Sequence, residues 1–208
     1  MTRFRSATAV IAALTALVSL AVMLTGRDNE AALAAGLIPA RLSGLMPMAN
    51  AVPAFLTPLT ATLLHGGALH LIFNLVMLVW VGTQLERVLG PKAVVACYLV
   101  GAYAAAGTQW LVGPASTMPM IGASGAISAL FGAYALMFGE PKQVFANRTA
   151  NRALHAAWLL AAWIVIQWMT ALLAGGEGML LATPAHIGGF IAGLLLQRPL
   201  LLWRYRGA

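Results

Sequence analysis

The chain has 208 residues, of which 61% are hydrophobic and only 8% are charged, and its formal net charge is +7. Soluble domains carry about 25% charged residues, so this composition excludes an ordinary soluble domain and indicates an integral membrane protein. The basic residues form no run and no patch with aromatic residues, which argues against a nucleic-acid partner.

Six apolar segments are candidates for membrane-spanning helices, which need about 20 mostly apolar residues. The six segments are residues 7–25, 67–85, 92–112, 124–139, 153–174 and 183–202. We therefore expect an all-α polytopic membrane protein in which residues 1–208 form a single membrane domain.

The first segment has features of a signal peptide as well as of a membrane helix. Arg3 and Arg5 precede its apolar run, and an Ala-x-Ala sequence follows at residues 32–34. The run is longer than the 7–15 residues or so of a signal peptide, and no soluble domain follows it. We expect it to stay as an uncleaved helix.

A long connection, residues 26–66, separates the first two apolar segments. It contains Pro39, Pro53 and Pro58 but is itself rather apolar. A disordered connection is one interpretation. Its hydrophobicity favours the other, a loop that packs against the bundle at the outer membrane interface.

Connections that are rich in Lys and Arg alternate along the chain with connections that have few. Of the twelve Lys and Arg residues, all except Arg27 and Arg41, which makes ten, fall on one side of the expected bundle. Positively charged connections stay in the cytoplasm, so we expect both termini to be cytoplasmic and residues 26–66 to be external.

Polar side chains inside apolar segments are costly in a bilayer, and each is therefore a functional candidate. They occur in or near the second, fourth and sixth segments, which are all expected to run from outside to inside, and they lie toward the outer half of each. The candidates are His65, His70, Asn74, Ser124, Ser128 and His186.

Ser124 stands at the start of the shortest segment. That helix would be about 24 Å long against a hydrocarbon core of about 30 Å, so its first residue would lie below the outer surface. Residues 112–123 would then enter the membrane, which irregular backbone tolerates only beside protein or water. The free N–H groups of a helix N-terminus could stabilise an oxyanion next to Ser124.

Other polar residues could complete a site for acyl transfer. His70 and Asn74 are four residues apart, share one helix face and could donate hydrogen bonds to the oxyanion. His186 would accept the proton of Ser124 and later protonate the leaving amine. Small residues on the fourth and sixth segments would allow the helices to approach closely. These small residues are Gly125, Ser128, Gly132, Gly189 and Gly193.

Simpler interpretations exist for each residue and for the set. Ser124 could cap or pack a helix, His70 and Asn74 could join helices, and His186 could be a core histidine. The histidines could also bind a metal or haem, but no carboxylate or thiol joins them. A transporter would predict inverted repeats and polar residues in both leaflets, and neither is evident.

Three motifs together resemble the rhomboid family of intramembrane serine proteases. They are His65-Gly-Gly-Ala-Leu-His70-Leu-Ile-Phe-Asn74, Gly122-Ala-Ser124-Gly125, and Ala185-His186-Ile-Gly-Gly189 with Gly193. Gly82, Glu86 and Gly90 are similar to the family's spacing after the second helix. Each motif alone has modest specificity. The three motifs together, in this order and on these helices, are highly specific.

The resemblance implies a six-helix rhomboid-like bundle with a Ser124–His186 dyad. His70, Asn74 and the backbone N–H of Ser124 would line the oxyanion site. His65, Gly122, Gly125, Ser128, Gly132, Gly189 and Gly193 would support the structure around it. The implied partners are transmembrane protein substrates in a lipid bilayer, and neither a metal nor an organic cofactor is implied. The short loops suggest a bacterial inner membrane, with the site open to the periplasmic side.

Two departures from the family pattern stand out. Many relatives have an aromatic residue where this chain has Ser128, and many have a Trp-Arg pair in the first external loop, where Ala40 precedes Arg41 here. The alternative function is an inactive relative that binds membrane clients. Dead relatives usually lack one member of the pair, whereas Ser124 and His186 are both present.

Overall fold

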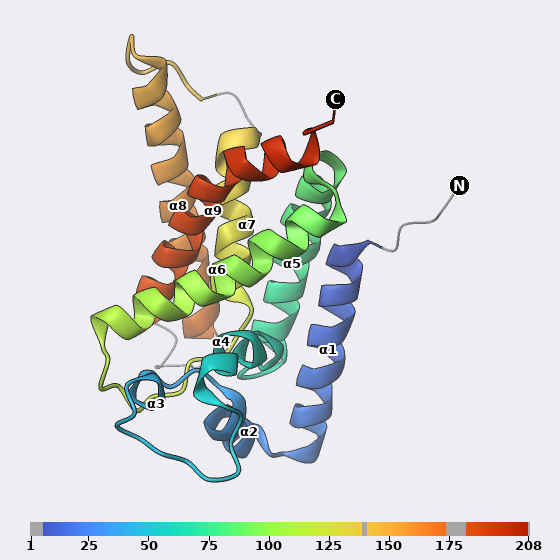
Figure 1. Ribbon diagram of the computed structural model, residues 1–208, viewed down its shortest axis with the longest axis vertical. Helices are drawn as coiled ribbons and strands as arrows, with labels where there is room; N and C mark the ends of the chain where they lie inside the picture. The colour runs from blue at the N-terminus through green and yellow to red at the C-terminus, as the bar shows by residue number, and fades with distance from the viewer. Residues whose placement is uncertain (1–5, 139–140, 174–181, 208) are drawn as a thin grey trace.

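The computed structural model describes residues 6–138, 141–173 and 182–207, and the regular elements in these ranges are helices (Figure 1). An isolated bridge pairs Leu37 with Met120. The helices are α1 (Ala7–Thr25), α2 (Asp28–Ala35), α3 (Pro39–Leu42), α4 (Thr57–Thr60), α5 (Ala68–Leu89), α6 (Pro91–Val112), α7 (Ser124–Met137), α8 (Arg148–Leu173) and α9 (Thr183–Arg204), with 3-10 turns at Ala54–Leu56 and Ala61–Leu63.

Each of the six apolar segments expected from the sequence coincides with a helix. Five of them, α1, α5, α6, α8 and α9, are long and apolar enough to cross a membrane. The sixth, α7, has 14 residues and is about 21 Å long at 1.5 Å per residue. The chain is therefore an integral membrane protein built from helices.

Two helices extend furthest beyond their apolar segments. Helix α5 continues through its charged end to Leu89 and stops at Gly90, whose φ of 79° favours glycine. Helix α8 begins at Arg148, five residues before the expected start, and the Asn147 side chain accepts a hydrogen bond from the N–H of Thr149. Hydropathy marks the apolar part of a helix, while capping groups decide where it ends.

The connection between α1 and α5 is folded and packs on the bundle. Its Leu37 and Ile38 side chains are fully buried. The guanidinium of Arg41 donates hydrogen bonds to the carbonyl groups of Ala34 (3.4 Å) and Val52 (2.5 Å), and so ties α2, α3 and the following loop together. A disordered connection is therefore the wrong interpretation.

A tryptophan from α6 also fastens this connection. The indole N–H of Trp110 donates to the hydroxyl of Ser43 (2.8 Å), which in turn donates to the carbonyl of Pro114 (2.7 Å). The connection between α1 and α5 is thus held by a tryptophan of a neighbouring helix.

Glu86 joins α1 to α5. Its carboxylate accepts hydrogen bonds from the hydroxyl of Ser6 (2.9 Å), the N–H of Ala7 (2.8 Å), and both the N–H (2.9 Å) and the hydroxyl (2.6 Å) of Thr8. A negative charge at a helix N-terminus satisfies free N–H groups and complements the helix dipole. The interaction fixes the first helix against the bundle.

The core lies where α7 packs against α6 and α9. A side chain at Gly189 or Gly193 of α9 would collide with the backbone of α7, at the carbonyl groups of Gly125 and Ala129 respectively. Only a residue without Cβ permits this approach. The two helices are therefore in backbone contact along one face.

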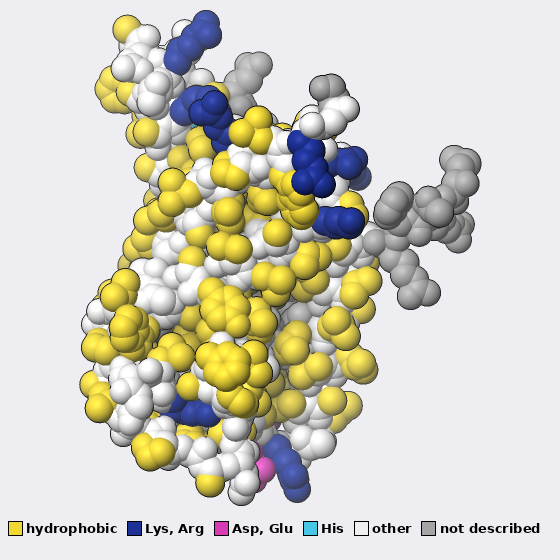
Figure 2. Space-filling view, viewed as in Figure 1, with side chains coloured by type: hydrophobic (Ala, Val, Ile, Leu, Met, Phe, Trp, Pro, Cys, Tyr) yellow, Lys and Arg dark blue, Asp and Glu magenta, His cyan; other side chains and the backbone are white. Residues whose placement is uncertain are grey.

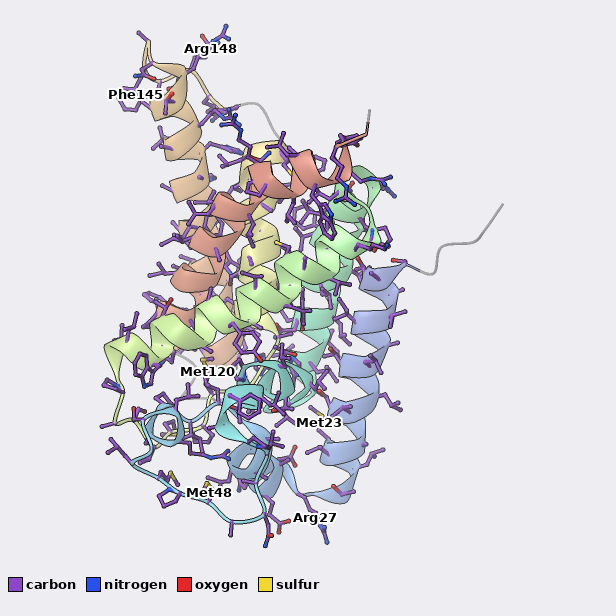
Figure 3. The ribbon with its side chains drawn as sticks, viewed as in Figure 1. Met23, Arg27, Met48, Met120, Phe145 and Arg148 are labelled. Carbon is purple, nitrogen blue, oxygen red and sulfur yellow. The ribbon has the colours of Figure 1, made fainter. Side chains whose placement is uncertain are left out.

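Charged and apolar side chains occupy different zones of the surface. Figure 2 shows Lys and Arg gathered at the end of the bundle where α8 begins and α9 ends, with hydrophobic side chains covering the middle. Figure 3 places Arg148 at this end and Arg27 at the opposite end. This distribution matches a body that is surrounded by lipid between two polar ends.

We predict that Gly193→Ala destabilises the protein by about 1–3 kcal/mol, because the new methyl group forces α9 away from α7. Thermal unfolding of the purified protein in detergent would measure the change. The matched control is Gly107→Ala on α6, where an added Cβ meets nothing within 4 Å. An equal loss of stability in both variants would contradict the packing argument.

Candidate active site

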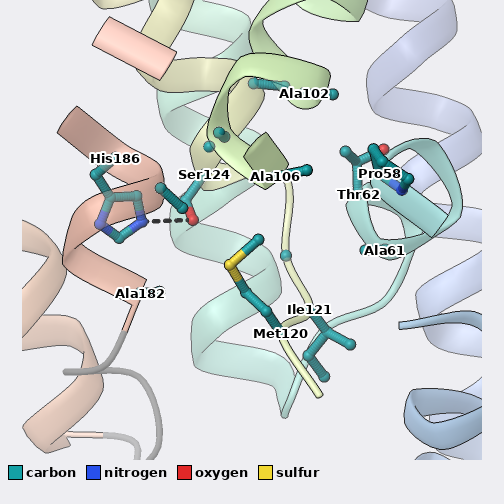
Figure 4. A pocket seen from close by; sticks show the side chains of 15 residues that line it. Pro58, Ala61, Thr62, Ala102, Ala106, Met120, Ile121, Ser124, Ala182 and His186 are labelled. Carbon is teal, nitrogen blue, oxygen red and sulfur yellow. Dashed lines mark hydrogen bonds between the residues drawn. The ribbon is translucent and has the colours of Figure 1, made fainter. Parts of the chain in front are cut away.

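Ser124 and His186 lie in hydrogen-bond contact inside the bundle. The hydroxyl of Ser124, the first residue of α7, is 2.8 Å from Nε2 of His186 on α9 (Figure 4). Both side chains are buried, with 8% and 4% of their surface exposed. The arrangement is that of a hydroxyl nucleophile beside its general base.

The backbone just before α7 adopts a conformation that favours glycine. Gly122 has a φ of 119°, and its N–H donates to the carbonyl of Ala61 (2.9 Å). A Cβ at this position would lie 2.9 Å from the ring of His70. Gly122 therefore permits both the turn into α7 and the approach of His70 to Ser124.

His65 supports the same turn. Its Nε2 accepts a hydrogen bond from the N–H of Ala123 (3.4 Å), and its Nδ1 is 2.9 Å from the hydroxyl of Ser19, which donates to the carbonyl of Leu63 (2.8 Å). Burial, and after it the nearby His70 ring, lowers the pKa of His65 to about 3, so the ring is neutral. The contacts then place its proton on Nδ1. His65 holds the chain before α7 in place.

His70 and Asn74 are one turn apart on α5 but are placed differently. The N–H of Gly66 donates to Nδ1 of His70 (3.4 Å), which leaves the proton of a neutral ring on Nε2. His70 lines one cavity with Ser124 and His186. The amide of Asn74 donates to the carbonyl of His70 (3.0 Å), and Asn74 is not among the residues that line this cavity.

Ser128 takes part in a chain of hydrogen bonds that reaches α8. The indole N–H of Trp163 donates to its hydroxyl (2.7 Å), and this hydroxyl donates to the carbonyl of Ser124 (2.7 Å). The Trp163 ring stacks on Phe131 with 4.4 Å between ring centroids, and also faces Phe73 of α5. An aromatic ring therefore fills the space beside Ser128, but it belongs to α8.

Sequence reasoning missed the polar side chains that α8 directs toward the site. The amide nitrogen of Gln167 is 3.4 Å from Nε2 of His186, and Thr170 lines the same cavity. Both residues are polar positions inside an apolar segment. The rule that selected the other candidates, applied to residues 153–174, would have found them.

The cavity between Ser124, His70 and His186 is small. Its volume is about 20 Å³, which is enough for a water molecule but not for a peptide segment. A second, adjoining cavity on the other side of Ser124 is lined mainly by small and apolar residues, among them Ala61, Ala102, Ala106 and Met120 (Figure 4). Within the described ranges, no group of three His, Cys, Asp or Glu side chains could hold a metal ion.

The geometry supplies the parts that acyl transfer needs. A hydroxyl lies within hydrogen-bond distance of an imidazole nitrogen, a second imidazole lines the same cavity, and the hydroxyl stands at a helix N-terminus. Hydrogen-bond donors at such a position stabilise the charge that develops on a tetrahedral intermediate.

Comparison with known proteins places this arrangement in a family. The model of the Rhomboid domain matches residues 54–203. The chain is 34% identical over 134 residues to rhomboid protease GlpG of Pectobacterium atrosepticum, which covers 64% of this chain and 44% of that protein. It is 30% identical over 135 residues to rhomboid protease GlpG of Yersinia pestis, with the same two shares.

A plant protein is similar over a longer stretch. The chain is 28% identical over 151 residues to RHOMBOID-like protein 4 of Arabidopsis thaliana, which covers 72% of this chain and 35% of the plant protein. The matches thus span less than half the length of these relatives.

We predict that Trp163 and Ser128 are energetically coupled. Trp163→Phe and Ser128→Ala should each lower the free energy of unfolding, and the double variant should lose about 1 kcal/mol less than the sum, because the bond is lost only once. Thermal unfolding of all four proteins measures the coupling. Strictly additive losses would show that the hydrogen bond contributes nothing.

Proposed function

The chain belongs to the rhomboid family, and we propose on this premise that it is an intramembrane serine endopeptidase. It would hydrolyse peptide bonds in or near the transmembrane segments of membrane-protein substrates. The observation that carries the proposal is the 2.8 Å contact between the Ser124 hydroxyl and Nε2 of His186 in a buried cavity.

The reaction follows from the positions of four groups. Nε2 of His186 accepts the proton of Ser124 as its oxygen attacks the carbonyl carbon of the substrate. The oxyanion receives hydrogen bonds from Nε2–H of His70, from the amide of Asn74 and from the backbone N–H of Ser124. The protonated His186 then gives its proton to the leaving amine, and water hydrolyses the acyl-enzyme by the same proton transfers in reverse.

Asn74 needs a small movement to play its part. One of its amide hydrogens is bound to the carbonyl of His70, and its amide oxygen has no partner among the described residues. A rotation of the side chain would bring the second hydrogen toward the oxyanion. We therefore assign the main side-chain contribution to His70.

We further propose that residues 1–208 form one rhomboid-like domain with six spans and both termini in the cytoplasm. Helix α1 begins and α9 ends at the same end of the bundle, where basic side chains gather (Figures 1 and 2). The charge distribution supports a cytoplasmic assignment for this end. The site would then open to the periplasmic side of a bacterial inner membrane.

An inactive client-binding protein is the second candidate. The plant relative is named RHOMBOID-like, without the word protease, and it is 28% identical over its match. The hydrogen-bonded Ser124–His186 pair favours the protease, because a client-binding protein needs neither side chain.

We predict that Ser124→Ala and His186→Ala each reduce cleavage of a model transmembrane substrate by at least about 10⁴-fold. The cause would be loss of the nucleophile or of its base, and gel analysis of the fragments measures the rate. Ser128→Ala, the same change one turn along α7, is the control and should leave cleavage readily measurable. Cleavage by the Ser124→Ala variant at the rate of wild type would refute the mechanism, and a wild type that binds but never cuts would favour the second candidate.

Loss of the oxyanion donors should reduce cleavage without abolishing it. We expect His70→Ala to lower kcat by about 10²-fold or more, as the removal of one such donor typically does, and Asn74→Ala to have a smaller effect. Steady-state kinetics with the same substrate would measure both. A larger loss from Asn74→Ala would reverse the assignment of the main donor.

A further inference from the structure

Gln167 places a hydrogen-bond donor beside the nitrogen that acts as the base. Its side chain extends from α8, is 7% exposed, and brings its amide nitrogen to 3.4 Å from Nε2 of His186. The mechanism proposed above gives this residue no role. A polar side chain at this depth in an apolar helix is costly unless it serves the site.

The Nδ1 atom of His186, the other ring nitrogen, has no group beside it among the described residues that would fix the tautomer. Nδ1 of His186 is buried and has no hydrogen-bond partner among the described residues. In a serine–histidine–aspartate triad, a carboxylate at Nδ1 holds the tautomer that leaves Nε2 free to accept the serine proton. His186 needs the same tautomer, but no such group lies at Nδ1 among the residues that the structure describes.

We propose that Gln167 is a positioning residue that holds His186 in the tautomer with the proton on Nδ1. An N–H group directed at Nε2 is favourable only when Nε2 carries no proton, so the donor selects the form that can act as a base. This inference rests on the proposed protease function and adds a residue to its site. In a triad the tautomer is fixed by a group at Nδ1, whereas here it would be fixed by a group at Nε2.

The position of Gln167 is fixed by a second contact one turn earlier on the same helix. Trp163 and Gln167 are four residues apart and share a face of α8. Trp163 donates to Ser128, which donates to the carbonyl of Ser124. Helix α8 is therefore bonded to the serine side of the pair through Trp163 and contacts the histidine side through Gln167.

The test replaces Gln167 in the full-length protein while keeping the size of its side chain. Gln167→Met removes the donor, and Gln167→Glu replaces it with an acceptor that favours a proton on Nε2. We expect both variants to lower kcat by about tenfold, a fraction of what proton transfer as a whole contributes, with KM changed less than about twofold. Thermal unfolding of each variant shows whether it is folded.

Trp168→Phe is the matched control. Trp168 also lies on α8 and donates a hydrogen bond to α9, from its indole N–H to the hydroxyl of Thr183 (3.1 Å), and it is not among the residues that line the cavity with His186. Its loss weakens the contact between the helices without altering the donor at Nε2. We expect kcat of this variant to remain within about twofold of wild type.

A spectroscopic measurement tests the tautomer without relying on activity. In protein labelled with ¹⁵N-histidine, the side-chain signals that disappear in His186→Ala belong to His186. They should show Nδ1 protonated in wild type at neutral pH, and a shift toward Nε2 protonation in Gln167→Glu. His70 and His186 are the two histidines that line this cavity, so His70→Ala in the same sample identifies any contribution from that ring.

The outcomes separate this inference from the function on which it rests. A wild-type protein without Ser124-dependent cleavage would overturn both. Normal kcat in Gln167→Met, equal losses in Gln167→Met and Trp168→Phe, or Nε2 protonation of His186 in wild type would each overturn the role of Gln167 alone, while the serine protease mechanism would stand.

Discussion

The approach of α7 to α9 is the constraint on which the polar centre depends. Gly189 and Gly193 leave only backbone between the helices at the points where Gly125 and Ala129 lie opposite. A buried hydroxyl and a buried imidazole are costly in an apolar bundle unless each meets a partner. The backbone contact brings the hydroxyl of Ser124 to 2.8 Å from Nε2 of His186, so each of these two atoms has a hydrogen-bond partner. The packing that stabilises the fold is also the packing that brings Ser124 and His186 together.

Two tryptophans connect neighbouring helices to serine hydroxyls. Trp110 of α6 donates a hydrogen bond to Ser43 in the connection between α1 and α5, and residues 26–66 contain no tryptophan. Trp163 of α8 bonds to Ser128 at the position where relatives often have a ring. In both cases an indole N–H from a neighbouring helix meets a serine hydroxyl. Each of these hydrogen bonds crosses a helix interface, so α6 and α8 are part of the support around Ser43 and Ser128.

Much of this arrangement could be predicted from the sequence, and the rest depends on contacts between helices. The six apolar segments, and the placing of Ser124 at the start of a short helix, followed from hydropathy and length because lipid thickness sets the scale. Ser124, His70 and His186 could be predicted to line one cavity because their positions in the three helices lie at a similar depth in the membrane. That residues 26–66 pack against the bundle also followed from their hydrophobicity, but the short helices within them did not. The distinct positions of His70 and Asn74, and the roles of Trp110, Trp163 and Gln167, did not follow either. They depend on the rotation of each helix about its axis, which periodicity in a uniformly apolar segment leaves undetermined.

The central claim is that His186 activates Ser124 as a nucleophile. Covalent labelling of the purified protein with a fluorophosphonate, followed by peptide mapping, tests it most directly because it requires no knowledge of the natural substrate. The claim predicts one adduct, on Ser124, and a rate of labelling that falls to background in His186→Ala. Labelling at another residue, or an undiminished rate without His186, would contradict it.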